Sequence, residues 1–181
     1  GEAVRTIPFG PQVLLPTSYV NDLRIDLGAG AAGTIYVTDS SLSGPGGIIV
    51  VDIASGTAIR RLSGHASTSP EPDFSMSFDG EPLRVRPAGA PPQPWRVASD
   101  GIALSADGAT LYWCALTSRR LYSAPTALLR DPAVTEAELA AAVRDLGPKP
   151  PSDGLAEDDR GRIYAGDLEG NAIHVLDPHG G

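Results

Sequence analysis

The chain has 181 residues, and 41% of them are hydrophobic, which suits one ordinary globular domain with a real core. Its net charge of −8 and the lack of any Lys/Arg cluster argue against nucleic acid as the main partner, because phosphate binding needs concentrated positive charge. No apolar run approaches the ~18 residues of a membrane span, so none is expected.

The first repeating unit is expected to run from about residue 21 to residue 62. An outer strand, Val4–Phe9, is expected before it. Short β-branched runs bounded by Gly, Asp and Ser predict four strands, namely Asn21–Leu27, Thr34–Asp39, Gly47–Ile53 and Thr57–Leu62. A proline-rich connection follows, with one predicted hairpin in which Ser75–Phe78 and Leu83–Arg86 flank the turn dipeptide Asp79-Gly80.

The second unit is expected at about residues 100–147 and the third at 153–181. Their predicted strands are Thr110–Leu116, Arg120–Ala124, Val143–Leu146, Arg162–Gly166 and Ala172–Leu176. One short helix is expected to interrupt them near residues 135–142, where Thr135 and Glu138 have the spacing of a capping box. The only cysteine, Cys114, cannot form an internal disulfide, and its strand context predicts a small buried hydrophobe.

One short phrase occurs three times along the chain, at Val20–Asp26, Ser99–Ser105 and Ser152–Asp158, each time before a turn and an apolar strand. Repeated four-stranded sheets of this kind predict an all-β fold of the β-propeller type. The phrase would then form the innermost strand of each blade. Asn21, Asp100 and Asp153 occupy the same position in the three copies, so we expect them to converge at one mouth of a central channel.

Four segments resemble the major royal jelly protein/yellow family, and they are Tyr19–Asp26, Asp100–Gly108, Leu116–Tyr122 and Leu146–Lys149 followed by Ser152–Gly154. The resemblance implies a six-bladed propeller, of which this chain holds about three blades. Missing blades or a second copy would close the ring. A looser similarity extends to gluconolactonases, regucalcin and paraoxonases. The Ala, Gly, Arg and Pro bias favours a bacterial member, and the family implies export, to the periplasm or out of the cell.

In the calcium-dependent lactonases of this wider group, inner-strand Asn and Asp residues hold a divalent cation in the channel. The resemblance therefore implies that Asn21, Asp100 and Asp153 are metal ligands, with Ca²⁺ as the expected cofactor, since Ca²⁺ prefers oxygen ligands. Asp153 would also be the catalytic general base. The alternative interpretation is a structural role, in which each Asp-Gly shapes the entry turn of its strand by hydrogen bonds from the side chain to the backbone.

The sequence is compatible with two functions. The first is metal-assisted hydrolysis of a lactone or ester, in which the metal polarises the carbonyl. The second is non-catalytic binding of a small molecule, which the royal jelly/yellow resemblance favours. In that case Tyr19 and Trp95 would supply aromatic walls, Asn21 would contact the ligand, and the acids would pair with a cationic group. The alternative for both aromatic residues is packing in the core or at its rim.

Overall fold

A computed structural model describes residues 1–178, which contain three antiparallel sheets of three or four strands and two small two-stranded sheets. The first sheet has the order β1 (Val20–Asp26), β2 (Thr34–Asp39), β3 (Gly47–Asp52) and β4 (Ala58–Arg61). The second has the order β9 (Ser99–Leu104), β10 (Thr110–Ala115), β11 (Arg120–Pro125) and β12 (Arg144–Pro148), and the third is β13 (Leu155–Glu157), β14 (Ile163–Asp167) and β15 (Ala172–Leu176). The predicted all-β class with blade-like sheets is confirmed.

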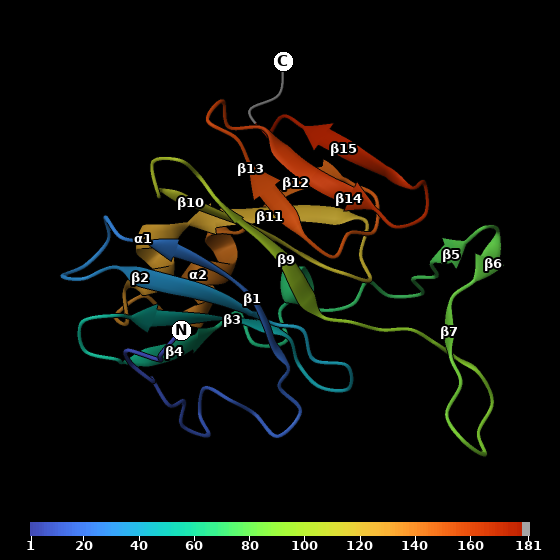
Figure 1. Ribbon diagram of the computed structural model, residues 1–181, viewed down its shortest axis with the longest axis horizontal. Helices are drawn as coiled ribbons and strands as arrows, with labels where there is room; N and C mark the ends of the chain where they lie inside the picture. Colours follow the sequence, from blue (N-terminus) through green and yellow to red (C-terminus); the bar gives the residue numbers. More distant parts are fainter. Residues whose placement is uncertain (179–181) are drawn as a thin grey trace.

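The innermost strands of the three sheets lie next to one another. Strand β9 contacts β1 on one side and β13 on the other, so the sheets fan out from a shared line (Figure 1). Arg24 of β1 reaches across this line, and its Nη2 donates a hydrogen bond to the carbonyl oxygen of Leu155, 2.6 Å away. The starts of the three inner strands therefore meet at one end of the molecule.

Apolar side chains fill the spaces between the sheets. Tyr36, Ile48 and Val50 of the first sheet pack with Ile102, Leu111 and Trp113 of the second. Between the second and third sheets, Cys114 lies fully buried in a smaller cluster, as its strand context predicts. Strand β3 is buried on both faces because it lies between neighbouring layers, which explains its unbroken run of β-branched residues.

Within residues 1–178, two α-helices and one short 3-10 helix (Ala66–Thr68) occur where one helix was predicted. Helix α2 (Glu136–Ala142) begins at Thr135 with both hydrogen bonds of the capping box, as expected. The prediction missed α1 (Thr126–Arg130), which follows β11 directly and buries Leu129. A five-residue helix is too short to show a clear period of 3.6 residues, so tertiary packing decides it. None of the helices within residues 1–178 is long and apolar enough to cross a membrane.

The segment Val4–Phe9 is not a strand, contrary to the prediction. Its apolar residues Ile7 and Phe9 instead pack with Val13 against the outer face of the first sheet. The segment has no hydrogen-bonded partner strand in the described chain. The partly buried side chains of Ile7 and Phe9, together with a hydrogen bond from Arg5 Nη1 to the carbonyl oxygen of Ile53, attach it to the first sheet. The last residues of the predicted third blade, 179–181, lie outside the described residues.

The long connection forms an arm, which we define as residues 75–95 (Figure 1). It contains two small hairpins, made by β5 (Ser77–Phe78) with β6 (Glu81–Pro82) and by β7 (Arg84–Val85) with β8 (Gln93–Pro94). Asp79 and Gly80 both have positive φ, which confirms the predicted turn. The register differs from the prediction, because a two-residue turn pairs Phe78 directly with Glu81. Leu83 still donates a backbone hydrogen bond to Met76, but Arg84 and Val85 pair with β8 instead.

Candidate functional site

The three repeated polar residues come together in the structure. Asn21 and Asp100 are the second residues of β1 and β9, and Asp153 lies two residues before β13. The side-chain Nδ2 of Asn21 donates a hydrogen bond to Oδ1 of Asp100, although 79 residues separate them in the chain. Asp153 lies close enough for its negative charge to act on Asp100. The contact between adjacent inner strands produces this arrangement.

Asp100 has an unusual environment for a carboxyl group. The residue is 3% exposed. Burial raises the pKa of Asp100 to about 7, with the negative charge of Asp153 as the next cause, and hydrogen bonds from Ser40 and Asn21 oppose the rise. Asp100 therefore changes its protonation near neutral pH, whereas Asp153 is exposed at the cavity. When a positively charged ligand binds beside the Asp100–Asp153 pair, Asp100 can release its proton, so that both carboxylates are ionised.

A cavity of about 730 Å³ opens at this end of the sheets, and we call it the inner cavity. All five residues singled out in the sequence line it, namely Tyr19, Asn21, Trp95, Asp100 and Asp153. Asp167 adds a third carboxylate, and most of the remaining wall is apolar. Within the described chain, the lining contains no Lys, Arg or His side chain. The cavity therefore combines an apolar wall with an acidic end.

Asp167 is a site residue that the sequence analysis missed. It ends β14, as Asp39 ends β2, so an aspartate that closes the strand after the first and the third repeated phrase was the available signal. Hydrogen bonds from the backbone N–H groups of Gly170 and Glu169 lower the pKa of Asp167 and keep it ionised. Asp167 also pairs with His174, whose Nε2 lies 3.2 Å from Oδ2.

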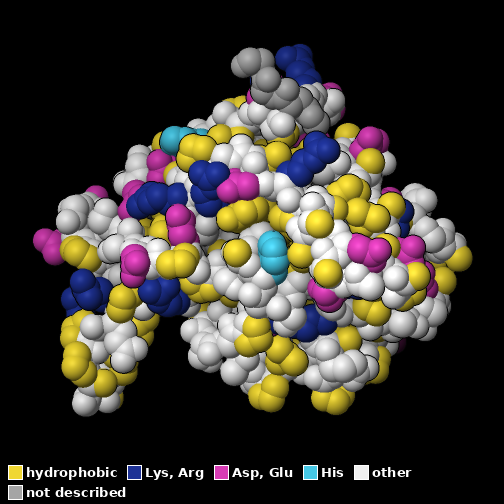
Figure 2. Space-filling model, turned by 180° about the vertical axis from the view of Figure 1, so that it is seen from behind, with side chains coloured by type: hydrophobic (Ala, Val, Ile, Leu, Met, Phe, Trp, Pro, Cys, Tyr) yellow, Lys and Arg dark blue, Asp and Glu magenta, His cyan; other side chains and the backbone are white. Residues whose placement is uncertain are grey.

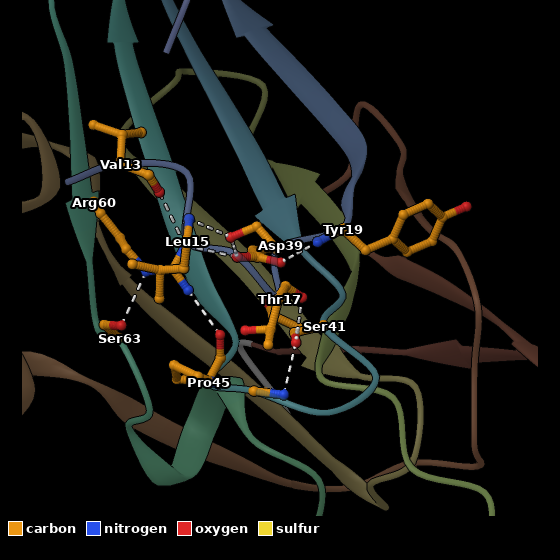
Figure 3. A network of polar contacts seen from close by, with 12 residues as sticks. Val13, Leu15, Thr17, Tyr19, Asp39, Ser41, Pro45, Arg60 and Ser63 are labelled. Carbon is orange, nitrogen blue, oxygen red and sulfur yellow. Dashed lines mark hydrogen bonds and ion pairs between the residues drawn. The ribbon is translucent and has the colours of Figure 1, made fainter. Parts of the chain in front are cut away.

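A buried ion pair holds the chain that carries Tyr19 (Figure 3). Asp39 accepts a hydrogen bond of 2.8 Å from the backbone N–H of Tyr19 and another from the hydroxyl of Ser18. Arg60 Nη1 lies 2.6 Å from Asp39, and the two side chains are only 5% and 0% exposed. The Tyr19 ring points away from this network and is 55% exposed, where it forms part of the cavity wall.

The residues present suit part of a calcium site by their chemistry. Asp100 and Asp153 offer carboxylate oxygens and Asn21 offers an amide oxygen, all of which Ca²⁺ accepts. A cation between the two aspartates would also offset the repulsion by Asp153, which is, after burial, the second cause of the raised pKa of Asp100. Three side chains supply fewer than the six to eight oxygens that Ca²⁺ takes. Within residues 1–178, no group of three or more His, Cys, Asp and Glu residues is placed to hold a metal.

Comparison with family models gives one match, described as major royal jelly protein, and it covers residues 1–181. The chain belongs to the major royal jelly protein family. A comparison with curated proteins finds no match. The family resemblance seen in the repeated motifs is therefore confirmed over the whole chain, and the fold of the family can be compared with solved structures.

Two solved structures with TM-scores above 0.5 confirm the propeller fold of this chain of the royal jelly protein family. A luciferin-regenerating enzyme matches with a TM-score of 0.55 and 14% identity, covering 92% of this chain and 44% of that one. Hydrazine synthase from Kuenenia stuttgartiensis matches with a TM-score of 0.56 and 14% identity, covering 89% and 46%. Regucalcin from Agrobacterium tumefaciens, described as a calcium-binding protein, has a TM-score of 0.48 and 18% identity, covering 90% and 46%. The chain spans about half the length of these structures and is a partial propeller.

Proposed function

We propose that the inner cavity binds a small organic cation, an amine with an apolar or aromatic body. The observation that carries this proposal is the composition of the lining, which has three aspartates, no basic side chain and an otherwise largely apolar wall among the described residues. An apolar pocket with a few convergent polar groups is the usual form of a small-molecule site. The sign of its charge selects the sign of the ligand.

The two aspartates at the inner strands would have different roles in this binding. Asp153 is exposed to the cavity and would accept a hydrogen bond from the ammonium group. Asp100 is buried behind it, is held by Asn21, and would share or release its proton as positive charge arrives. Tyr19 and Trp95 would contact the apolar body of the ligand, and an aromatic face also attracts a nearby cation.

Titration calorimetry with phenethylamine and its neutral analogue 2-phenylethanol tests this proposal. Asp153→Asn should weaken phenethylamine about tenfold, the scale of one charged hydrogen bond, and leave 2-phenylethanol unchanged. The matched control is Asp159→Asn, an exposed turn aspartate outside the cavity lining. If the wild-type protein binds neither compound, or if Asp153→Asn weakens both equally, the proposal is wrong.

The Asp100–Asp153 pair also favours a second candidate, metal-assisted hydrolysis of a lactone or ester. Two carboxylates whose charges repel are what a divalent cation would stabilise, and Asn21, Asp100 and Asp153 would hold it. Bound there, Ca²⁺ would polarise the substrate carbonyl. Asp153, as the exposed carboxylate, would act as general base toward water.

A panel of lactones and aryl esters, assayed with added Ca²⁺ and with chelator, separates the two candidates. Calcium-dependent turnover that Asp153→Ala abolishes and Asp159→Ala does not would establish the hydrolase. Absence of turnover, together with amine binding by calorimetry, would assign the cavity to binding alone.

A further inference from the structure

The arm supplies one wall of the inner cavity. Met76, Phe78, Leu83 and Trp95 all belong to it and all line the cavity. Residues 78–94 are exposed, and the arm projects from the body as a separate lobe (Figures 1 and 2). The position of this wall therefore depends on how the base of the arm is attached to the blades.

The base of the arm is held by a small apolar cluster and by very few polar contacts. Phe74 and Met76 pack with Leu116, while Trp95 and Leu168 cover the edge of the cluster. Within residues 1–178, the hydrogen bonds that join the arm to the blades are made at Ser75 and Ser77. Because so few contacts attach the arm to the blades, the arm can move as one unit.

Glu169 is the centre of these polar contacts. It lies in the turn between β14 and β15, and its Oε1 accepts a hydrogen bond of 2.9 Å from the backbone N–H of Ser77. Arg119, in the turn before β11, donates to both carboxylate oxygens of Glu169, at 2.6 Å and 3.0 Å. The guanidinium of Arg119 also lies 5.3 Å from the centre of the Phe74 ring and donates to the carbonyl oxygen of Ser75.

We propose that Glu169 is a positioning residue for the inner cavity, which fixes the arm through Ser77 and Arg119 and so sets how closely the apolar wall encloses the ligand. Its carboxylate, carried by the third blade, contacts both Arg119 of the second blade and Ser77 of the arm. The expected effect of Glu169 on ligand affinity rests on the proposed binding function. The attachment of the arm itself does not depend on any ligand.

Fluorescence quenching by acrylamide tests the attachment directly. Trp113 is fully buried, so the quenchable signal comes from Trp95 at the cavity. We expect Glu169→Ala to raise the quenching constant about twofold, and Glu169→Gln to raise it less, because glutamine keeps an acceptor for Ser77. The control is Asp145→Asn, which removes the partner of Arg120, in an ion pair between β11 and β12 of the second blade that does not involve the arm.

Ligand binding then tests the consequence. Glu169→Ala should weaken phenethylamine and 2-phenylethanol to the same degree, about tenfold, because both lose an apolar contact. Asp153→Asn should weaken only the amine, so the two residues act separately. If wild-type protein binds neither probe, the proposed function fails while the quenching result still decides the attachment. Unchanged quenching and unchanged affinity in Glu169→Ala and Glu169→Gln would overturn the inference.

Discussion

Asp100→Asn should stabilise the protein at alkaline pH and leave it unchanged at acid pH. The pKa of Asp100 is raised from 3.8 to about 7 in the folded protein, mainly by burial and then by Asp153. Between these two values the unfolded chain releases the proton and the folded chain keeps it. The free energy of unfolding therefore falls as pH rises, and the stabilisation present below pH 3.8 is lost by the time the pH passes about 7.

The size of the effect follows from the same numbers. Each pKa unit corresponds to 1.36 kcal/mol, which sets an upper limit of about 4 kcal/mol at pH 8. Solvent screening from the open cavity reduces this, and we expect about 2 kcal/mol. Asparagine keeps an acceptor oxygen for Asn21 and carries no charge, so the substitution isolates the ionisation.

Urea unfolding followed by circular dichroism at pH 4 and pH 8 measures this difference. The wild-type protein and Asp100→Asn should have equal unfolding free energies at pH 4, with the variant about 2 kcal/mol more stable at pH 8. Asp159→Asn, at an exposed turn, serves as the control for a general charge effect. The same difference at both pH values, or a variant less stable at pH 8, would refute the account of the site.

Three further substitutions test how the frame around the cavity is held. Gly101→Ala should cost about 2 kcal/mol by overpacking, since its added methyl would lie 2.9 Å from a carbonyl oxygen of the chain entering the third sheet; Gly154→Ala, with open space, should cost far less in the same urea assay. Arg60→Ala should lower the unfolding free energy by about 3 kcal/mol, because it leaves the buried carboxylate of Asp39 unpaired; a loss under 1 kcal/mol would contradict this. Thr135→Ala should cost about 1 kcal/mol and lower helical circular dichroism, and an unchanged melting curve would count against the cap.

Local patterns were sufficient to predict most of the elements. The run Thr34–Asp39 is a strand with the predicted bounds, because β-branched and aromatic residues favour an extended chain between turn residues. Helix α2 was predicted within its bounds because Thr135 and Glu138 satisfy the first N–H groups regardless of the rest of the fold. Interactions of this kind act over a few residues and can be seen in the sequence.

The site was predicted only in part, because some of its contacts join residues that are far apart in the chain. The repeated phrase indicated that Asn21, Asp100 and Asp153 share a position, and the structure brings them together. The contacts of Glu169 with Ser77 and Arg119 join residues 92 and 50 positions apart, and no local sequence pattern predicts them. Their roles in binding stay predictions.

The sequence by itself determined most of the strands, the longer helix, the family resemblance and the positions where each inner strand begins. The tertiary structure alone decided how deeply Asp100 is buried, which side chains close the cavity, and where the arm is attached. The physical reason is the distance along the chain over which each interaction acts. Propensity, capping and turn geometry depend on neighbours within a few residues, whereas burial, charge repulsion and cavity shape depend on the packing of blades that are far apart in the chain.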